Sequence, residues 1–316
     1  MHLSKSMYFN MAVTKIPIPY EFVRGSERAR ERDHAKNLFK RMWLEMRQLF
    51  GQLSDDANVR AIVLSGAGDR AFTTGLDVQA ASSGLLSGSS DASDGARAAK
   101  ILRYHIGEFQ DCITAIERCE KPVVAAMHGF CLGLAVDVST AADVRVCAAN
   151  AKFAVKEVDI GLAADIGTLS RLPKVVGSYG WVKEVSFTAR NWGSEEALRV
   201  GFVNNVFPSK EDTVRGALEL AGSIAGKSPV AVQGTKELLN YSRDRGVLDG
   251  KPFLLPLLLS FLFSFFPTPF LCHELTLYMT GLQYTKIWNS VALQTEDLTA
   301  ALLSGIQKRK PTFSKL

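Results

Sequence analysis

Apolar residues recur at helical spacing early in the chain and then give way to short, almost continuous apolar runs. Over residues 32–50 they return every three or four positions, which predicts an amphipathic helix. Residues 60–65 form an apolar run that stops at Gly66, as a buried strand does. The alternation then repeats, with a helix expected over residues 101–116 and a strand over residues 122–127.

The same pattern continues through the middle of the chain. Further strands are expected over residues 144–148 and 152–155, and further helices over residues 133–142, 180–187, 194–200, 210–227 and 230–243. Short apolar strands that alternate with helices predict an α/β architecture with much parallel sheet. Residues 80–95, rich in Ser, Gly and Ala, interrupt the pattern and predict a flexible surface loop.

The composition changes abruptly between residues 251 and 280. Residues 252–272 carry no charge, so a membrane segment has to be considered. Prolines interrupt this stretch, and its continuous apolar core, residues 257–266, is shorter than the ~18 to 20 residues that a spanning helix needs. Pyrimidine-rich codons would encode its Phe, Leu, Ser and Pro content. Our hypothesis is that residues 251–280 are a translated intron, which a spliced transcript that still encodes them would disprove.

Composition and charge narrow the possible functions. The chain has 316 residues and 47% hydrophobic content, enough for a large core. Its net charge of +5 is dispersed, which suits an anionic small substrate and does not indicate nucleic acid. The five cysteines form no CxxC pair and no Cys/His metal spacing, so we expect a reducing compartment and no structural metal.

The two ends of the sequence differ in their targeting signals. Residues 1–20 lack a basic stretch followed by an apolar one, so no secretory signal is expected. The last three residues, Ser314, Lys315 and Leu316, form the tripeptide that the peroxisomal import receptor recognises. We therefore expect a peroxisomal protein.

Two glycine-containing turns connect expected strands to expected helices. The first is A-F-T-T-G-L-D-V, residues 71–78, and the second is H-G-F-C-L-G-L-A-V-D, residues 128–137. Backbone N–H groups are free at such junctions, and a helix N-terminus favours negative charge. Two of these groups that converge on one point would form an oxyanion hole, although each turn alone is more typical of an ordinary connection.

Three carboxylates stand among apolar residues in V-K-E-V-D-I-G-L-A-A-D-I-G, residues 155–167. A buried, ionised carboxylate without a partner is costly, so each acid is expected to be a surface, a paired or a catalytic residue. The structural alternative for Glu157 is a surface ion pair with Lys152 or Lys156. For Asp165 it is the N-cap of a following helix.

Taken together, these motifs resemble the crotonase, or enoyl-CoA hydratase/isomerase, superfamily. The resemblance rests on A-F-T-T-G-L-D, on K-P-V-V-A-A-M-H-G-F-C-L-G-L-A-V-D-V-S-T-A-A-D-V-R-V and on F-A-V-K-E-V-D-I-G-L-A-A-D-I-G-T-L-S-R-L-P-K-V-V-G. The last block, together with Y-S-R-D and T-F-S-K-L near the C-terminus, is most similar to the Δ3,5-Δ2,4-dienoyl-CoA isomerases. The resemblance covers residues 59–245 and resumes over residues 282–316.

The resemblance implies an architecture and a substrate class. It implies a crotonase-like spiral core of ββα units over residues 1–245 and a C-terminal helical trimerisation region over residues 246–316, which the apolar insertion at 251–280 interrupts. It also implies an acyl-CoA thioester substrate and a homo-oligomer, either a trimer or a dimer of trimers. No cofactor is expected because coenzyme A is part of the substrate, and no metal or transmembrane span is expected.

The resemblance also assigns roles to residues in an isomerase of fatty-acid β-oxidation. Converting a 3,5-dienoyl-CoA to the 2,4-isomer removes a proton from C2 and returns one at C6, and two carboxylates can reach both carbons. The pair would be Glu157 and Asp165, in an order left open, within an apolar lining that raises their pKa values. Asp137 would orient or tune Glu157, or else be a helix-terminal acid with a structural hydrogen bond. The implied oxyanion-hole amides are those of Leu76 and Leu134, and the implied substrate-binding residues are Thr74, Gly75, Leu76, Asp77, Val78 and Leu134.

Other polar residues are assigned more ordinary roles. Asp143 is expected to be structural and Asp159 to be a cap or a surface residue. His128 stands beside the second turn and could help shape it. Arg171 and Lys174 could meet CoA phosphates, although single basic residues after a helix are more often solvated.

The sequence departs from the family upstream of Trp43. The family has a strand hairpin there, whereas residues 22–41 are charged and show no strand pattern, so residues 1–42 are expected to be atypical. Two alternatives to the isomerase follow. An enoyl-CoA hydratase would hold a water between two acids, which Asp165 and the short side chain of Asp137 disfavour. A non-catalytic, membrane-attached protein of the same fold would account for the altered N-terminus and the apolar run.

Overall fold

The computed structural model describes residues 9–15, 20–22, 32–75, 94–245, 282, 285–287, 289, 295–307, 309 and 311–315. The chain divides into a unit that extends to Gly226 and a C-terminal unit that begins at Lys227, and each is considered by itself. Residues 80–93 of the expected surface loop, the apolar insertion and the predicted site residues Leu76, Asp77 and Val78 lie outside the described residues.

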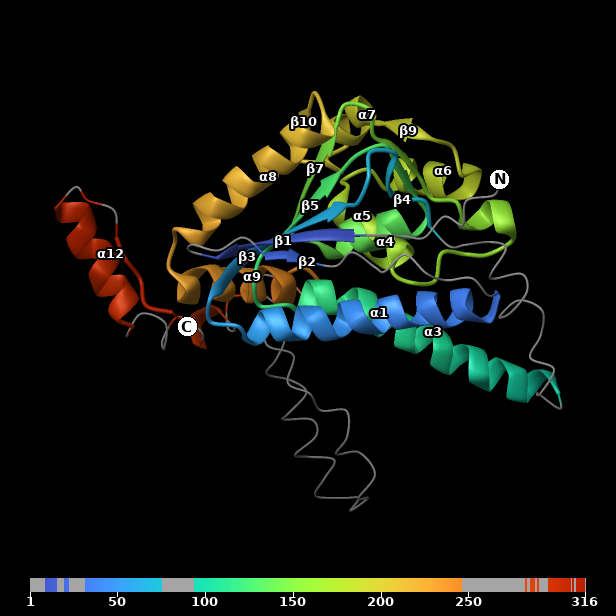
Figure 1. The fold of residues 1–316 in the computed structure, drawn as a ribbon, viewed down its shortest axis with the longest axis horizontal. Helices are drawn as coiled ribbons and strands as arrows, with labels where there is room; N and C mark the ends of the chain where they lie inside the picture. Colours follow the sequence, from blue (N-terminus) through green and yellow to red (C-terminus); the bar gives the residue numbers. More distant parts are fainter. Residues whose placement is uncertain are drawn as a thin grey trace, which may run out of the picture. The chain divides into compact units, whose positions relative to one another are not determined.

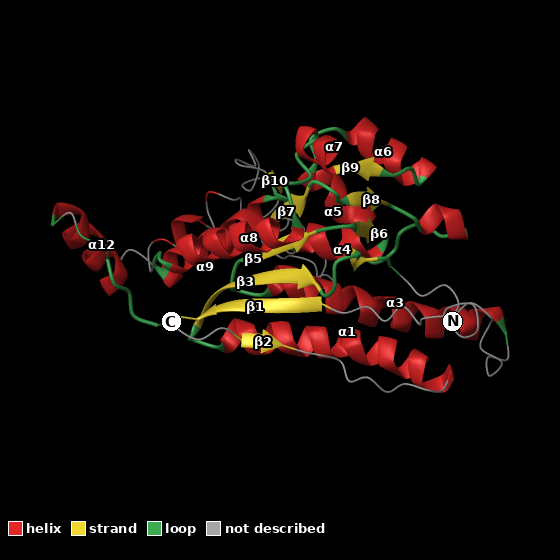
Figure 2. Ribbon diagram, turned by 45° about the horizontal axis from the view of Figure 1, so that its top comes forward, coloured by secondary structure: helices red, strands yellow, loops and turns green. Residues whose placement is uncertain are grey.

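Two sheets form the framework of the N-terminal unit (Figures 1 and 2). The larger has the order β10-β7-β5-β3-β1-β2, and the smaller has the order β4-β6-β8-β9. Strands β3, β5, β7 and β10 are parallel neighbours, as the alternation of strands and helices predicts. The strands are β1 (Phe9–Lys15), β2 (Tyr20–Phe22), β3 (Val59–Gly66), β4 (Ala71–Thr73), β5 (Val123–Met127), β6 (Phe130–Leu132), β7 (Val144–Ala148), β8 (Lys152–Ala154), β9 (Trp192–Gly193) and β10 (Asn205–Phe207).

From β3 to β8, consecutive strands alternate between the two sheets. β3, β5 and β7 belong to the larger sheet, while β4, β6 and β8, which follow them, belong to the smaller one. Helix α3 (Gly95–Arg118) follows the first pair and α4 (Leu134–Ala141) the second. This repeated order of two strands and a helix agrees with the predicted spiral of ββα units.

Helices cover both faces of the larger sheet, and the period-two pattern of the strands explains why. Val63 of β3 packs with Ala217 of α8 (Lys210–Ala225). The neighbouring Leu64 belongs instead to the main core, which also contains Phe50 of α1 (Arg32–Asp55) and Ile113 of α3. Figure 1 shows α8 on one side of the strands and the paired helices α1 and α3 on the other.

Three of the remaining helices begin at serine caps. The Ser178 and Ser209 side chains accept the first-turn N–H groups of α6 (Tyr179–Thr188) and α8, as N-cap residues do. Ser228 does the same for α9 (Pro229–Ser242), which starts with a proline at its first turn. The others are η1 (Glu157–Ile160), α5 (Thr168–Val175), α7 (Ser194–Arg199) and α12 (Glu296–Ile306).

The N-terminal hairpin, whose loss the sequence suggested, is present. β1 pairs antiparallel with β2, placing Met11 opposite Phe22, and also with β3, placing Met11 opposite Leu64. The prediction was wrong because these strands lie upstream of the charged stretch, which leads into α1. The main partner of β1 is β3, which is distant in sequence, so local patterning does not reveal the pairing.

Three further expectations concern membranes, metals and cysteines. Within the described part of the chain, no helix combines the length and apolar character needed to cross a membrane. The same residues contain no cluster of His, Cys, Asp and Glu that could hold a metal ion. Cys112, Cys119, Cys131 and Cys147 are buried free thiols.

Candidate active site

The carboxyl ends of β4, β6 and β8 meet at one edge of the smaller sheet. β4 pairs in parallel with β6, and β6 pairs in parallel with β8. Consequently Gly75, Gly133 and Glu157, which follow these three strands, start from neighbouring positions. Ligands of α/β sheets bind at such carboxyl edges. The sequence did not predict β4 and β6, since each has only three residues inside what it presents as a turn.

The two predicted glycine turns touch each other. Gly75 and Gly133 have φ angles of 84° and 54°, which favour glycine. A methyl group on Gly75 would lie 3.0 Å from the carbonyl oxygen of Leu132 and 3.7 Å from the Cα of Gly133. Leu134 follows as the first residue of α4, where a backbone N–H has no partner within the helix. Its N–H thus has the character of an oxyanion donor, whereas the predicted second donor, Leu76, lies outside the described residues.

The carboxylate of Glu157 lies against the second turn. A methyl group on Gly133 would lie 3.1 Å from Oε1 of Glu157. Oε2 is buried and has no hydrogen-bond partner among the described residues. Burial, followed by the negative charges of Asp137 and Asp165, raises the pKa of Glu157 to about 7. A carboxyl group with such a pKa can accept or release a proton near neutral pH.

The ion-pair alternative for Glu157 does not fit Lys156. The Lys156 ammonium lies 3.0 Å from Oδ2 of Asp159 and donates to the carbonyl of Ala189 at 2.7 Å. Asp159 is therefore a surface partner of Lys156, in agreement with its expected role. Asp143 is structural, as expected, since it accepts the N–H of Val123 at 2.7 Å.

Asp137 is buried in α4 and is 2% exposed. Its Oδ1 accepts the N–H of Thr168 at 2.6 Å, which supplies an acceptor to the first residue of α5. Burial raises the pKa of Asp137 to about 6, while hydrogen bonding by Thr168 and the charge of Arg171 act in the opposite direction. Asp137 thus has the structural hydrogen bond of one expectation and the proximity to Glu157 of the other.

Asp165 completes the group of three acids but lies in a different environment. Its side chain is exposed, unlike the apolar surroundings expected for both members of the pair. Its charge nevertheless raises the pKa values of Asp137 and Glu157, so the three carboxylates lie close together. The N-cap of α5 is Gly167, so the alternative that Asp165 caps this helix is wrong.

Arg171 was expected to be solvated or to meet phosphates, and the structure contradicts both. It lies inside α5, is 9% exposed and forms an ion pair of 3.0 Å with Glu117 of α3. Gln110, also in α3, donates to the backbone carbonyl of Asp165 at 2.6 Å. Sequence reasoning missed these contacts because they join segments more than fifty residues apart.

His128 is a buried residue that contacts the strand leading into the first turn. It is 1% exposed, its Nε2 lies 2.9 Å from the carbonyl of Gly68, and burial lowers its pKa. Its own carbonyl accepts the N–H of Phe72 in β4 at 2.9 Å. His128 therefore helps to hold the strand that leads to Gly75 in the first turn, whereas the sequence suggested a role in the second turn. Thr74, which directly precedes Gly75, is exposed.

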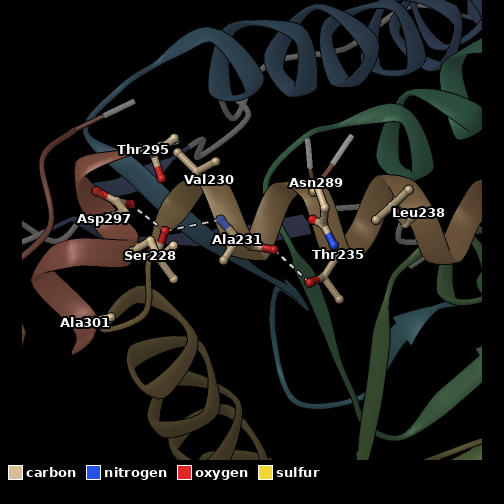
Figure 3. A pocket seen from close by; sticks show the side chains of 11 residues that line it. Ser228, Val230, Ala231, Thr235, Leu238, Asn289, Thr295, Asp297 and Ala301 are labelled. Carbon is tan, nitrogen blue, oxygen red and sulfur yellow. Dashed lines mark hydrogen bonds between the residues drawn. The ribbon is translucent and has the colours of Figure 1, made fainter. Parts of the chain in front are cut away.

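The C-terminal unit contains a cavity of about 270 Å³ lined by residues of α9 and α12 (Figure 3). Ser228 donates to the carboxylate of Asp297 there and accepts the N–H of Ala231. Thr235 donates to the carbonyl of Ala231. These polar groups satisfy one another and include none of the predicted site residues, so the cavity is not the candidate active site.

Comparison with known proteins identifies relatives that match most of the chain. Residues 29–248 match the family described as Enoyl-CoA hydratase/isomerase. The chain is 43% identical over 280 residues to the mitochondrial Delta(3,5)-Delta(2,4)-dienoyl-CoA isomerase of Homo sapiens, which covers 88% of this chain and 75% of the relative. It is 38% identical over 283 residues to the peroxisomal Delta(3,5)-Delta(2,4)-dienoyl-CoA isomerase of Arabidopsis thaliana, with 90% of each chain covered.

Solved structures agree on the fold. The enoyl-CoA hydratase from Bacillus anthracis has a TM-score of 0.67 at 25% identity and covers 87% of this chain and 88% of its own. An enoyl-CoA hydratase from Polaromonas sp. JS666 has the same TM-score of 0.67 at 20% identity, covering 86% of this chain and 88% of its own. The predicted crotonase-like α/β architecture is therefore confirmed.

Proposed function

Because the chain belongs to the enoyl-CoA hydratase/isomerase family, we propose that it is an isomerase that converts a 3,5-dienoyl-CoA into the 2,4-dienoyl-CoA. The observation that carries the proposal is that the Glu157 carboxylate lies beside the Gly133 turn, with Asp165 close enough for its charge to raise the pKa of Glu157. Relatives that are 38% and 43% identical are named Delta(3,5)-Delta(2,4)-dienoyl-CoA isomerases, which supports the same substrate class.

The reaction moves one proton and shifts the double bonds. A base removes a proton from C2, and the electron pair of that bond forms the C1–C2 double bond of an enolate with negative charge on the thioester oxygen. When the enolate collapses, electrons move to C2–C3 and C4–C5, and the former C5–C6 pair accepts a proton at C6. No oxidant or separate cofactor is consumed, since coenzyme A is part of the substrate.

We assign removal of the C2 proton to Glu157. Its Oε1 lies beside the Gly133 turn, so it would be close to a thioester oxygen bound by the N–H of Leu134. C2 is adjacent to the thioester carbon, whereas C6 is several bonds farther along the acyl chain. Asp165, on the next segment, would therefore deliver the proton to C6.

The surroundings suit these roles in physical terms. A pKa of about 7 gives Glu157 both a usable ionised fraction and enough basicity at neutral pH. Donors at the oxyanion, such as the proposed N–H groups of Leu76 and Leu134, typically contribute about 3 to 4 kcal/mol each to a transition state. Asp137 would act as a positioning residue by tuning Glu157 through its charge.

The test is a direct assay of isomerisation. Purified full-length protein is mixed with a 3,5-dienoyl-CoA, and the ultraviolet absorbance of the conjugated 2,4-product is followed. We expect conversion by the wild type and its loss in Asp165→Asn. A folded wild type that binds acyl-CoA but forms a hydroxyacyl-CoA from a 2-enoyl-CoA instead would replace the isomerase proposal with a hydratase.

Two further parts of the proposal concern location and assembly. The relative from Arabidopsis thaliana is named peroxisomal and the human one mitochondrial, and the tripeptide 314–316 favours the peroxisome for this chain. Loss of peroxisomal import on deletion of residues 314–316 would support this, and unchanged import would contradict it. We also propose a trimer or a dimer of trimers, which sedimentation of the purified protein would test.

A further inference from the structure

The segment from Asp165 to Arg171 carries one of the two proposed acid/base groups on an exposed side chain. An exposed carboxylate is fixed in space only as well as the backbone that bears it. Gly167, within the segment, has a φ of 149°, and a methyl group there would overlap Nη1 of Arg171. The backbone at Gly167 therefore packs directly against the guanidinium of Arg171.

A stripe of polar residues on α3 meets this segment. Gln110 Nε2 donates to the carbonyl of Asp165 at 2.6 Å. Thr114 Oγ1 accepts from Arg171 Nη2 at 2.9 Å, and Glu117 Oε2 accepts from Arg171 Nε at 3.0 Å. Positions 110, 114 and 117 are spaced i, i+4 and i+7, so they share one face of the helix. One face of α3 thus holds both ends of the segment.

The charges in this contact are well enclosed. The side chains of Arg171 and Glu117 are 10% and 14% exposed, and a buried pair is strongly destabilised when one partner is removed. On its other side the segment is held by Asp137, which accepts the N–H of Thr168. Contacts from α3 and α4 therefore restrain the backbone on either side.

We propose that Gln110, Thr114, Glu117 and Arg171 form a positioning frame that holds Asp165 where it can protonate the far end of the diene. The inference rests on the proposed isomerase function. The four side chains act through the backbone of Asp165 and through α5, and they are positioning residues because they need not touch the substrate. Glu157, which follows β8, does not depend on this frame.

Because only Asp165 depends on the frame, removal of the C2 proton and protonation at C6 can be measured separately. In D2O, removal and return of the C2 proton by Glu157 introduces deuterium at C2 of unreacted substrate, whereas isomerisation also needs Asp165. Gln110→Met removes the donor to Asp165 and keeps an unbranched side chain that suits a helix. We expect its isomerisation kcat to fall about tenfold to a hundredfold, with KM unchanged and C2 exchange within about twofold of wild type.

Matched variants make the test specific. Lys100→Met makes a similar change at an exposed position of the same helix, and both rates should stay at the wild-type level. Thr114→Val removes the acceptor for Arg171 and should repeat the selective loss, while Thr114→Ser, which keeps the hydroxyl, should restore isomerisation.

The outcomes distinguish this inference from the function on which it rests. Equal loss of exchange and isomerisation in Gln110→Met and Thr114→Val would show a general structural defect and overturn the frame. Unchanged isomerisation in both variants would overturn it as well. A wild type that does not isomerise the substrate would instead overturn the proposed function, before any variant is compared.

Discussion

Glu157 and Asp165 are eight positions apart in one apolar stretch, yet the fold treats them differently. The Glu157 carboxylate lies against the Gly133 turn, with one oxygen buried, and its pKa is raised to about 7. Asp165 has an exposed side chain, and its backbone carbonyl is held by Gln110. Glu157 is distinguished by its half-buried carboxylate, whereas Asp165 is distinguished by the hydrogen bond that supports its backbone.

This contrast suggests a division of labour between the two ends of the substrate. A carboxylate out of water is a stronger base, which suits the removal of a proton from carbon. An exposed carboxyl group exchanges protons with water easily, which suits a group that must be reset after each turnover. Substitutions at each acid would show whether the roles of Glu157 and Asp165 can be separated in this way.

The largest effect is expected when the half-buried Glu157 is neutralised. Glu157→Gln keeps the shape of the side chain but removes the base, so both C2 exchange and isomerisation should fall by about 10²- to 10⁴-fold. Asp159→Asn, two positions away in the surface pair with Lys156, is the matched control and should remain active. Retention of C2 exchange by Glu157→Gln would show that another group takes the C2 proton.

A selective effect is expected at the exposed acid. Asp165→Asn should lower isomerisation by about 10²- to 10³-fold, because protonation at C6 loses its donor. Deuterium exchange at C2, measured by mass spectrometry of recovered substrate, should continue since Glu157 is unchanged. If exchange disappeared together with isomerisation, the two acids would not act on different carbons.

The contrast also shows what the sequence could predict. The amphipathic pattern around Ile113 predicted α3, and the apolar runs predicted β3, β5 and β7, because these elements bury a regular face that is legible locally. Strands β4 and β6 were missed since three residues carry no period, and their pairing is with each other across the chain. The N-terminal hairpin was missed because the main partner of β1 is β3, which lies far along the chain.

The candidate site, too, could be predicted only in part from the sequence. Motif resemblance selected the three acids, and the structure brings Asp137, Glu157 and Asp165 together. Their environments could not be predicted, because exposure depends on distant segments such as α3. Gln110, Thr114 and Glu117 have the spacing of one helix face, but nothing local indicated that Asp165 and Arg171 would be their partners.

A smaller effect is expected where the turn meets Glu157. Gly133→Ala places a methyl group 3.1 Å from Oε1 at a φ of 54°, so the carboxylate must shift. We expect kcat/KM to fall about tenfold to a hundredfold and stability to fall by about 1 kcal/mol. Gly201→Ala carries similar backbone strain, at a φ of 81°, with no neighbour within 4 Å among the described residues, and should lose stability alone. Equal activities of the two variants would place Glu157 away from the turn in the working enzyme.

The smallest change in rate is expected from Asp137→Asn, and its signature is a shift with pH. The asparagine can still accept the N–H of Thr168, but its neutral side chain no longer raises the pKa of Glu157. That pKa should fall below about 7, so the acidic limb of kcat/KM moves to lower pH while the plateau drops less than about tenfold. Asp143→Asn, which alters another structural carboxylate, should leave the limb in place.

Stability gives the same substitution a second, independent readout. The folded-state pKa of Asp137, about 6, lies above its ordinary value of 3.8, so the folded protein binds the proton more tightly than the unfolded chain. Ionisation therefore costs stability progressively as pH rises from about 4 to about 6, and the cost persists at higher pH. Asp137→Asn should then be more stable than wild type by about 1 to 3 kcal/mol at pH 8 and nearly equal to it at pH 4, as urea unfolding would show. If the acidic limb of kcat/KM moved but the stability at pH 8 did not rise, Asp137 would not be a buried charge in the working enzyme. The contrast between a less exposed and a more exposed acid would then rest on Glu157 and Asp165 alone.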